Sequence, residues 1–239
     1  LCLSLGLAIS SVIIAEIYFE QTYDTYFKGW NRTYQISEVG NNQGQSMHFN
    51  YTSGATAHGV KSYAPMVEAA TRIRGYQEGA QCKFEDQSSL NATMILADSC
   101  FFDVFPQKML VGNAKQALSQ PMSCVVSSEW AEKVGGNVVG KRFTTPNSPG
   151  RTFVIGGVFE SFPWGSSFHG KDVIISLDST PSLFSFDGRD QWVGNDCYES
   201  YIRLAKGHKS DELKPFVEKM RKDNFPLKEM RKMGFELNY

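Results

Sequence analysis

The chain has 239 residues, which is enough for one large domain or two small ones with a buried core. Its 24 lysines and arginines nearly balance 25 aspartates and glutamates, so no overall positive charge favours nucleic acid as a partner. Hydrophobic residues make up 41% of the chain and charged residues 21%, a composition that is typical of folded proteins and excludes a disordered one. The five cysteines have no CxxC spacing, which disfavours a zinc site. One disulfide bond is an open alternative, but we favour cysteines that are buried as small apolar side chains.

The chain begins with an apolar stretch, LCLSLGLAISSVIIA, that carries no charge before Glu16. This stretch is shorter than the roughly 20 residues that span a bilayer, and it lacks the basic start and the cleavage site of a secretory signal. A buried core helix is one interpretation. We favour the end of a transmembrane helix, residues 1–15, because an aromatic-rich segment follows, as expected where a helix leaves a membrane. That segment contains Ile17, Tyr18, Phe19, Tyr23, Tyr26, Phe27 and Trp30.

The first half of the chain mixes helix and strand patterns. One long helix is predicted over residues 1–29, with Gly29 as its end. A strand over 33–39, a turn at NNQGQ and a second strand over 46–52 follow. A short helix within 53–64 precedes a meander of strands over 67–98, which Gly75 and Gly79 interrupt. SCFFDVFP predicts a helical turn with Ser99 as its cap and Pro106 as its end.

The second half is richer in strands. Strands are predicted at MSCVVS, RFTT, RTFVIGGVFES, KDVIISL and CYESYIRL. SEWAEKV predicts a helix that Gly135 and Gly136 end in a left-handed conformation. The last predicted element is a helix over 211–222, with an apolar stripe at i, i+3, i+4 and i+7. The stripe consists of Leu213, Phe216, Val217 and Met220.

The segment GGNVVGKR (residues 135–142) is similar to a phosphate-binding loop, but its context excludes that function. Such a loop follows a strand, precedes a helix and carries Ser or Thr after the lysine. Here a helix precedes the segment, a strand follows it, and Arg142 occupies the hydroxyl position. We therefore expect a helix end and a turn, and no ATP site.

No enzyme motif is present in the sequence, and we predict no catalytic, cofactor-binding or metal-binding residue. The four histidines are scattered, and the His169–Asp172 pair offers too few ligands for a metal. No GxSxG or GxGxxG sequence occurs. Most aromatic residues are expected in the core, among them Phe101, Phe102, Phe105, Trp130 and Phe159. Trp164, in a Pro-Trp-Gly turn, is the one candidate for contact with a partner.

A series of motifs resembles the MacB-like periplasmic core domain of MacB/FtsX-type permeases. The block Ala97–Phe143 contains Ala97-Asp98 followed by Phe101-Phe102, then Gly112-Asn113 with Ala117-Leu118, Ala131-Glu132-Lys133 and Gly140-Lys141. The segments Glu20–Ile36 and Phe153–Phe168 are similar to the family's membrane exit and to its strand that ends in G-V-F-x-x-x-P-x-x-S. The chain departs from the family at Val134-Gly135, where Phe-Gly is usual, and in the short loop 137–139.

The resemblance implies an α+β fold with two subdomains. A discontinuous porter-like subdomain would comprise residues 16–86 and 188–239, and an inserted β-rich, sabre-like subdomain would comprise 87–187. Both would follow the end of the first transmembrane helix, at residues 1–15.

The resemblance also implies a function. Members are permease subunits of ABC transporters of the mechanotransmission type, in which the external domain is not catalytic and carries ATP-driven motion for efflux or envelope export. The implied location is the inner membrane, with this domain in the periplasm. The implied partners are a cytoplasmic ATPase subunit, a second copy or paired permease, and an envelope protein, but no nucleic acid. The alternatives are a membrane-anchored extracytoplasmic sensor, which would bind a ligand, and a tethered envelope enzyme.

Overall fold

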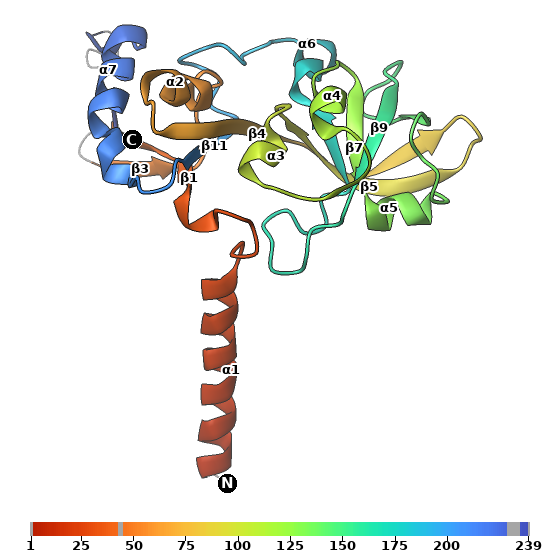
Figure 1. Ribbon diagram of the computed structural model, residues 1–239, viewed down its shortest axis with the longest axis horizontal. Helices are drawn as coiled ribbons and strands as arrows, with labels where there is room; N and C mark the ends of the chain where they lie inside the picture. Colours follow the sequence, from red (N-terminus) through yellow and green to blue (C-terminus); the bar gives the residue numbers. More distant parts are fainter. Residues whose placement is uncertain (1, 43–44, 229–234, 239) are drawn as a thin grey trace.

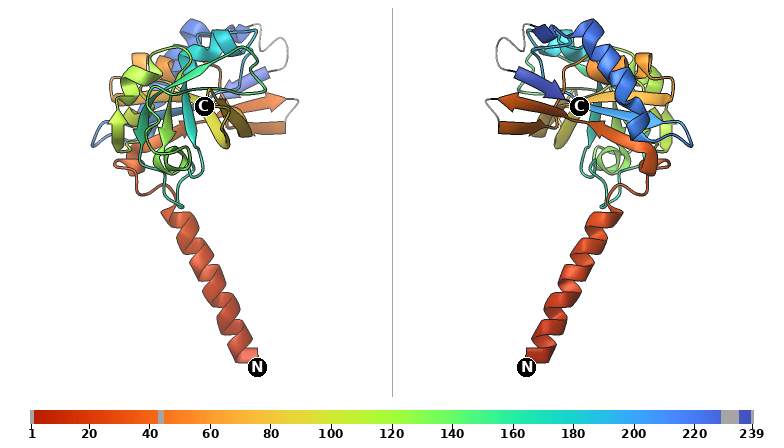
Figure 2. Two further views of the ribbon diagram at one scale, coloured as in Figure 1. Left: turned by 90° about the vertical axis from the view of Figure 1, so that its right-hand side faces the viewer. Right: turned by 90° about the vertical axis from the view of Figure 1, so that its left-hand side faces the viewer.

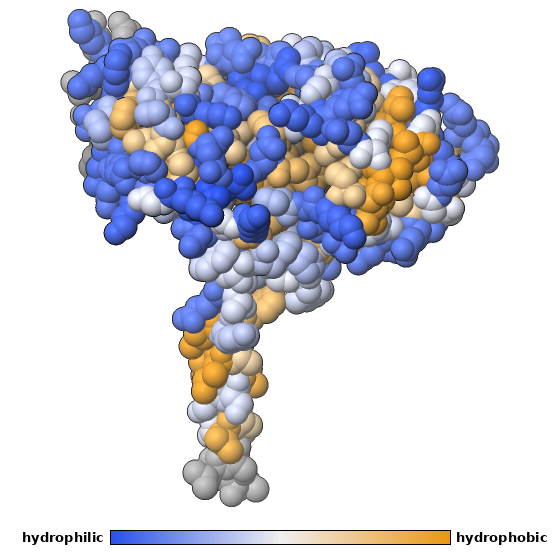
Figure 3. Space-filling model, viewed as in Figure 1, coloured by the Kyte–Doolittle hydropathy of each residue, from blue (hydrophilic) through white to orange (hydrophobic). Residues whose placement is uncertain are grey.

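A helix projects from a mixed α+β domain in the computed structural model, which describes residues 2–42, 45–228 and 235–238 (Figures 1 and 2). α1 (Cys2–Thr22) is exposed over residues 6–21, and its apolar side chains lie on the surface (Figure 3). Among the described residues, no helix has both the length and the apolar character to cross a membrane. The predicted α+β class is confirmed.

One large mixed sheet forms the centre of the domain. Its order is β1 (Thr33–Ile36), β11 (Glu199–Leu204), β4 (Val67–Phe84), β5 (Ser89–Ala97), β10 (Val173–Ser176), β7 (Ser123–Ser127), β9 (Phe153–Phe159) and β6 (Met109–Gly112), with β8 (Arg142–Thr144) beside β4 and β9. A smaller sheet has the order β12 (Phe235–Asn238), β2 (Glu38–Asn42) and β3 (Gln45–Phe49). Strands from the two ends of the chain therefore pair with each other, β1 with β11 and β2 with β12.

The short strand β8 closes part of the large sheet into a barrel. Phe143 of β8 is the register partner of both Phe84 in β4 and Phe153 in β9. β4, β5, β10, β7, β9 and β8 consequently form a closed ring, in which β5–β10 and β7–β9 are parallel pairs. A closed ring leaves none of these strands with a fully open edge, which protects them from pairing with other chains.

The barrel interior is packed with apolar and aromatic side chains. Met94 and Leu96 of β5 point into it, whereas the alternate residues Ile95 and Ala97 point to the outer face. Successive side chains of a strand point to opposite faces of the sheet. Because both faces are buried here, the central strands are apolar on both. Inside, the rings of Phe143 and Phe153 stack with centroids 5.3 Å apart.

Short helices cover the barrel. α5 (Ser128–Lys133) is capped by Ser127, whose hydroxyl accepts the Trp130 amide. The helix buries the Trp130 ring against Phe84 and Phe143. α3 (Phe101–Val104) and α4 (Ala114–Leu118) cover the outer face with a second apolar cluster. The remaining short helices are η1 (Trp30–Arg32), η2 (Leu177–Ser179), α6 (Thr180–Leu183) and η3 (Ser210–Leu213).

A third apolar cluster packs at the other end of the sheet. α2 (Thr56–Tyr63) lies on β11 and on β4, and α7 (Lys214–Asn224) packs against α2 (Figure 1). The predicted stripe of the last helix is confirmed, because Leu213 and Met220 are buried and Phe216 and Val217 are partly buried in this cluster.

Three sequence predictions were wrong in detail. The first helix ends at Thr22 and not at Gly29, because the Asp24 backbone takes a left-handed conformation with φ 58°. The meander over 67–98 is one long hairpin, β4–β5, in which register shifts near Gly75 and Gln77 accommodate irregularity without ending the strand. The cap of α3 is Cys100 and not Ser99.

The other sequence predictions were confirmed, altered in their bounds or left untested. The predicted strand over 33–39 is split into β1 and β2, and the turn NNQGQ lies partly outside the described residues. Gly135 and Gly136 have φ of 110° and 83° after α5, as predicted for a helix end. The division into subdomains at 86/87 and 187/188 stays a prediction; the first position lies in the turn between β4 and β5.

We expect the barrel interior to dominate stability. Phe143→Ala removes a buried ring that contacts Phe84, Trp130 and Phe153, and it should lower the free energy of unfolding by about 3–5 kcal/mol. Val139→Ala, at an exposed position nearby, should change it by less than about 0.5 kcal/mol. Urea unfolding followed by circular dichroism measures both; equal effects of the two variants would contradict this account of the core.

Candidate functional site

The chain leaves α1 through a tight bend that is bound to a distant loop. The backbone N–H of Asp24 donates to the carbonyl oxygen of Gly165 at 2.8 Å. The carboxylate of Asp24 accepts the Ser167 amide at 2.8 Å and also accepts the Ser167 hydroxyl. Both partners belong to the β9–β10 loop (residues 160–172), which lies beside the bend in Figure 1. We call these contacts, together with those of Tyr23, Tyr26 and Phe27, the helix joint.

Two tyrosines of the bend reach the same loop. The hydroxyl of Tyr23 donates to the Ser166 carbonyl oxygen at 3.2 Å, and that of Tyr26 donates to the Ser166 hydroxyl at 3.4 Å. Burial raises the pKa of Tyr26, so its phenol stays a donor. The loop therefore receives polar contacts from three residues within one short segment of the bend.

Phe27 anchors the bend in the domain. Its side chain is 3% exposed, and its ring packs edge-on against Phe105, Phe162 and Phe168 at centroid distances of 5.3, 6.1 and 6.1 Å. Such aromatic pairs contribute about 0.5–1.5 kcal/mol each beyond the burial of their area. The sequence analysis placed Phe27 in an aromatic segment at the membrane exit. The structure differs, because the ring of Phe27 is buried in the domain.

Trp164 lies in the β9–β10 loop, directly before Gly165. It is 72% exposed, and its ring contacts only the edge of the His169 ring among the described aromatic pairs, at 4.9 Å. The other aromatic residues proposed for the core are placed as expected: Phe101, Phe105, Trp130 and Phe159 are buried, and Phe102 is partly buried. Trp164 thus differs from them in its exposure, and its role as a partner contact stays a prediction.

A small cleft separates the helix joint from β11. Its volume is about 140 Å³. Its walls are Tyr23, Asp24, Phe27, Trp30, Thr33, Gln35, Phe105 and Tyr201. A second hollow, of about 160 Å³, lies beside the GGNVVGKR segment between Glu85, Asp86, Lys141 and Arg142, whose charges balance. The strand β8 begins at Arg142, so a strand follows the GGNVVGKR segment, as predicted from the sequence.

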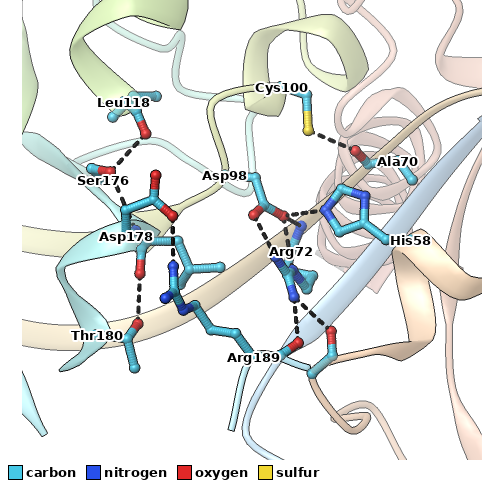
Figure 4. A network of polar contacts seen from close by, with 12 residues as sticks. His58, Ala70, Arg72, Asp98, Cys100, Leu118, Ser176, Asp178, Thr180 and Arg189 are labelled. Atoms are coloured by element: carbon cyan, nitrogen blue, oxygen red, sulfur yellow. Dashed lines mark hydrogen bonds and ion pairs between the residues drawn. The ribbon is translucent and has the colours of Figure 1, made fainter. Parts of the chain in front are cut away.

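A buried ion pair connects four segments of the domain (Figure 4). The Asp98 carboxylate accepts Arg72 Nη2 at 2.8 Å through one oxygen, and Arg72 Nε at 3.0 Å through the other. Arg72 Nη1 donates to the carbonyl oxygens of Gly54 and Arg189 at 2.8 and 2.5 Å. His58 of α2 contacts the same carboxylate at 3.0 Å. The pair therefore joins the sheet to the loop before α2 and to the loop before β11.

The electrostatics of this network favour the charged pair. Burial alone would raise the pKa of Asp98, but hydrogen bonds from His58 and Arg72 and the charge of Arg72 outweigh burial and hold that pKa well below its usual range. Burial opposes the charge of Arg72, but the hydrogen bonds and charge of Asp98 raise its pKa. Both groups stay ionised at neutral pH as a result.

The same network contains three potential metal ligands, on His58, Asp98 and Cys100, whose atoms lie within 4.8 Å of one another. Both Asp98 oxygens already accept bonds from the Arg72 cation, which repels a metal ion. The Cys100 thiol donates to the Ala70 carbonyl oxygen at 2.9 Å, and burial raises its pKa to about 11. Metal ligation requires the thiolate, so this cluster fits a structural ion pair better than a metal site.

The sequence analysis missed this network, although Asp98 belongs to the motif Ala97-Asp98. Arg72 and His58 lie 26 and 40 residues before Asp98, so no local spacing signals the contact. The four cysteines whose surroundings are described, Cys82, Cys100, Cys124 and Cys197, are free and partly or fully buried, as favoured above.

We expect Asp98→Asn to destabilise the domain by about 3–5 kcal/mol near neutral pH, because Arg72 would be left charged and buried. The folded-state pKa of Asp98 is depressed, so its stabilisation is complete above the unfolded pKa of about 3.9 and is lost as the pH falls through the folded pKa. The stability difference between wild type and variant should shrink on acidification. Urea unfolding over a pH series measures it, with the exposed Asp103→Asn as the matched control. A difference that is independent of pH would contradict the charged pair.

Comparisons with known proteins agree with the motifs and the fold. The family model described as MacB-like periplasmic core domain matches residues 1–218. A domain of a permease protein from Porphyromonas gingivalis is 30% identical, with 89% of each chain covered and a TM-score of 0.80. The periplasmic region of MacB from Actinobacillus actinomycetemcomitans shares the fold at 13% identity, with 88% of this chain and 89% of that chain covered and a TM-score of 0.54. The search of curated proteins gives no match. The chain belongs to the MacB-like periplasmic core domain family, the extracytoplasmic part of ABC transporter permeases.

Proposed function

We propose that this domain transmits conformational change between membrane helices and the periplasm, as part of a mechanotransmission-type permease in the inner membrane. ATP hydrolysis would occur on a separate cytoplasmic subunit, and the motion would drive efflux or envelope export. Residues 1–15 would be the end of the first transmembrane helix. The domain itself would have no catalytic role.

The helix joint is the observation that carries this proposal. Asp24 binds the β9–β10 loop through polar contacts, and Phe27 inserts into the aromatic cluster three residues later. The two strands that flank this loop are members of the closed barrel. A displacement of α1 would therefore reach a stiff barrel directly, which is what rigid-body transmission requires.

The arrangement of the chain ends supports the proposed subdomains. β1 pairs with β11, β2 with β12, and α2 packs against α7, so the segments 16–86 and 188–239 contact each other. We propose that these segments form the porter-like subdomain and that residues 87–187 form the sabre-like one. The helix joint would then connect the two subdomains, because its bend belongs to the porter-like segment and its β9–β10 loop to the sabre-like one.

The proposed partners are a cytoplasmic ATPase, a second copy or a paired permease, and an envelope protein at Trp164. Trp164 is suited to that last role because it combines high exposure with a position on the loop that would move with α1. A large exposed tryptophan is a frequent anchor of protein interfaces.

A pull-down of the full-length parent protein from membranes in mild detergent tests the partners. We expect an ATPase with a Walker motif to co-purify in stoichiometric amount with both the wild type and Trp164→Ala, whereas an envelope protein should be lost only with Trp164→Ala. Mass spectrometry identifies the bound chains. Repeated absence of an ATPase from intact protein would favour the extracytoplasmic sensor, and equal recovery of every partner would remove Trp164 from the interface.

The joint itself is testable in the purified transporter complex. Asp24→Gly deletes the carboxylate but permits the positive φ of 58°, so the bend can form while the polar attachment to Ser167 is lost. Spin labels at Val139→Cys in each of two copies should change their separation when ATP and vanadate are added, and Asp24→Gly should reduce this change while ATP hydrolysis continues. Lys28→Gln, exposed in the same bend, is the control. An unaltered change of distance in Asp24→Gly would exclude the contacts of the Asp24 carboxylate as the path of transmission.

A further inference from the structure

We propose that the cleft beside the helix joint binds a substituted ammonium group. Five of its eight wall residues are aromatic, one is an aspartate and none is basic. The electron-rich faces of aromatic rings attract organic cations, and cages of such rings with a nearby carboxylate are suited to methylated ammonium groups. The cleft volume of about 140 Å³ matches a head group and not a larger molecule.

The floor and the rim of the cleft differ in exposure. Phe27 and Phe105 form a buried floor with Tyr201 beside it, so the base is preformed by the core. At the rim, Tyr23 is 38% exposed and Trp30 is 51% exposed. A ligand in the cleft would cover these two partly exposed rings.

The charges around the cleft are suited to a cation. Asp24 is one of the wall residues, and the carboxylate of Glu199 accepts the hydroxyl of Tyr201, another wall residue, at 3.0 Å. The Asp24 carboxylate accepts its hydrogen bonds from the amide and hydroxyl of Ser167, which are neutral donors.

Two arginines also lie near the bend. Arg32 and Arg203 flank Gly29, and both bind Glu68, at 2.7 and 2.5 Å. Their positive charge is thus directed to a carboxylate outside the cleft wall. An anion would be repelled by the carboxylate of Asp24. A divalent metal ion such as Ca²⁺ binds six or more oxygen atoms, whereas the wall offers a single carboxylate. An organic ammonium ion satisfies both the rings and the carboxylate.

The ammonium group has two sources, a free small cation and the choline head group of a lipid. The cleft begins at Tyr23, directly after α1 ends, so a lipid head group lies within reach if α1 enters the membrane. That source rests on the proposed function, whereas binding of a free cation does not. The two are distinguishable by the probe.

The test uses the 239-residue chain in maltoside detergent and phosphate buffer, with tetramethylammonium chloride as the probe. The indole N–H resonance of Trp30 should shift with saturation, while those of Trp130 and Trp192 stay unchanged and sodium chloride produces no shift. A second titration compares short-chain phosphatidylcholine with phosphatidylglycerol. Tighter binding of the choline lipid than of tetramethylammonium identifies the lipid source, and equal binding identifies free cations; both outcomes support the site.

Matched variants separate the cleft from general effects on the protein. Trp30→Ala removes one exposed wall and should weaken tetramethylammonium binding about tenfold, measured by calorimetry. Asp24→Asn keeps the shape of the side chain and should weaken it by at least about threefold, because the charge is lost. Trp164→Ala, an exposed tryptophan outside the cleft wall, should have no effect. No saturable shift at Trp30, or unchanged affinity in Trp30→Ala, overturns the proposal.

Discussion

The continuous strand β4 is the constraint on which the rest of the domain depends. Its 18 residues pair with β11 at the beginning, with β5 along most of their length and with β8 at the end. One strand therefore belongs both to the terminal region and to the barrel. Arg72 lies where β4 passes from one to the other, and its bonds to Asp98 and to two loop carbonyls hold both regions to the strand. The terminal region and the barrel are consequently joined by one continuous strand.

Two kinds of interaction attach α1 to this framework, and they differ in strength and in direction. The hydrogen bonds between Asp24 and Ser167 are exposed to water, so each contributes only about 0.5–1.5 kcal/mol. Burial of a phenylalanine side chain contributes about 1.5–3 kcal/mol, and the ring contacts of Phe27 add to this. Phe27 therefore supplies most of the attachment, whereas the directional bonds of Asp24 fix the orientation of the bend.

Much of the fold could be predicted from local pattern. The helix at Trp130 was predicted together with its end at Gly135 and Gly136. The apolar runs of β7 and β10 predicted strands, and the structure buries these strands on both faces. The barrel was not predictable, because its closure depends on three residues of β8 and on pairings between distant segments. Phe27 was misjudged for a related reason: an aromatic residue after an apolar helix has the same local pattern whether its ring faces a membrane or a core. The cleft and the Arg72–Asp98 pair depend on contacts over long separations, which a single sequence does not reveal.

The position of β10 has a consequence for how this protein is made. β10 lies between β5 and β7 in the sheet, although it follows both of them in the chain. Until residue 176 has emerged, β5 and β7 have no partner on those sides, and their apolar residues, such as Leu96 and Val126, remain uncovered. Insertion of a late strand between two early ones is a long-range pairing, which is slow. A chain that has emerged only this far therefore has two unpaired strand edges, a feature that promotes aggregation.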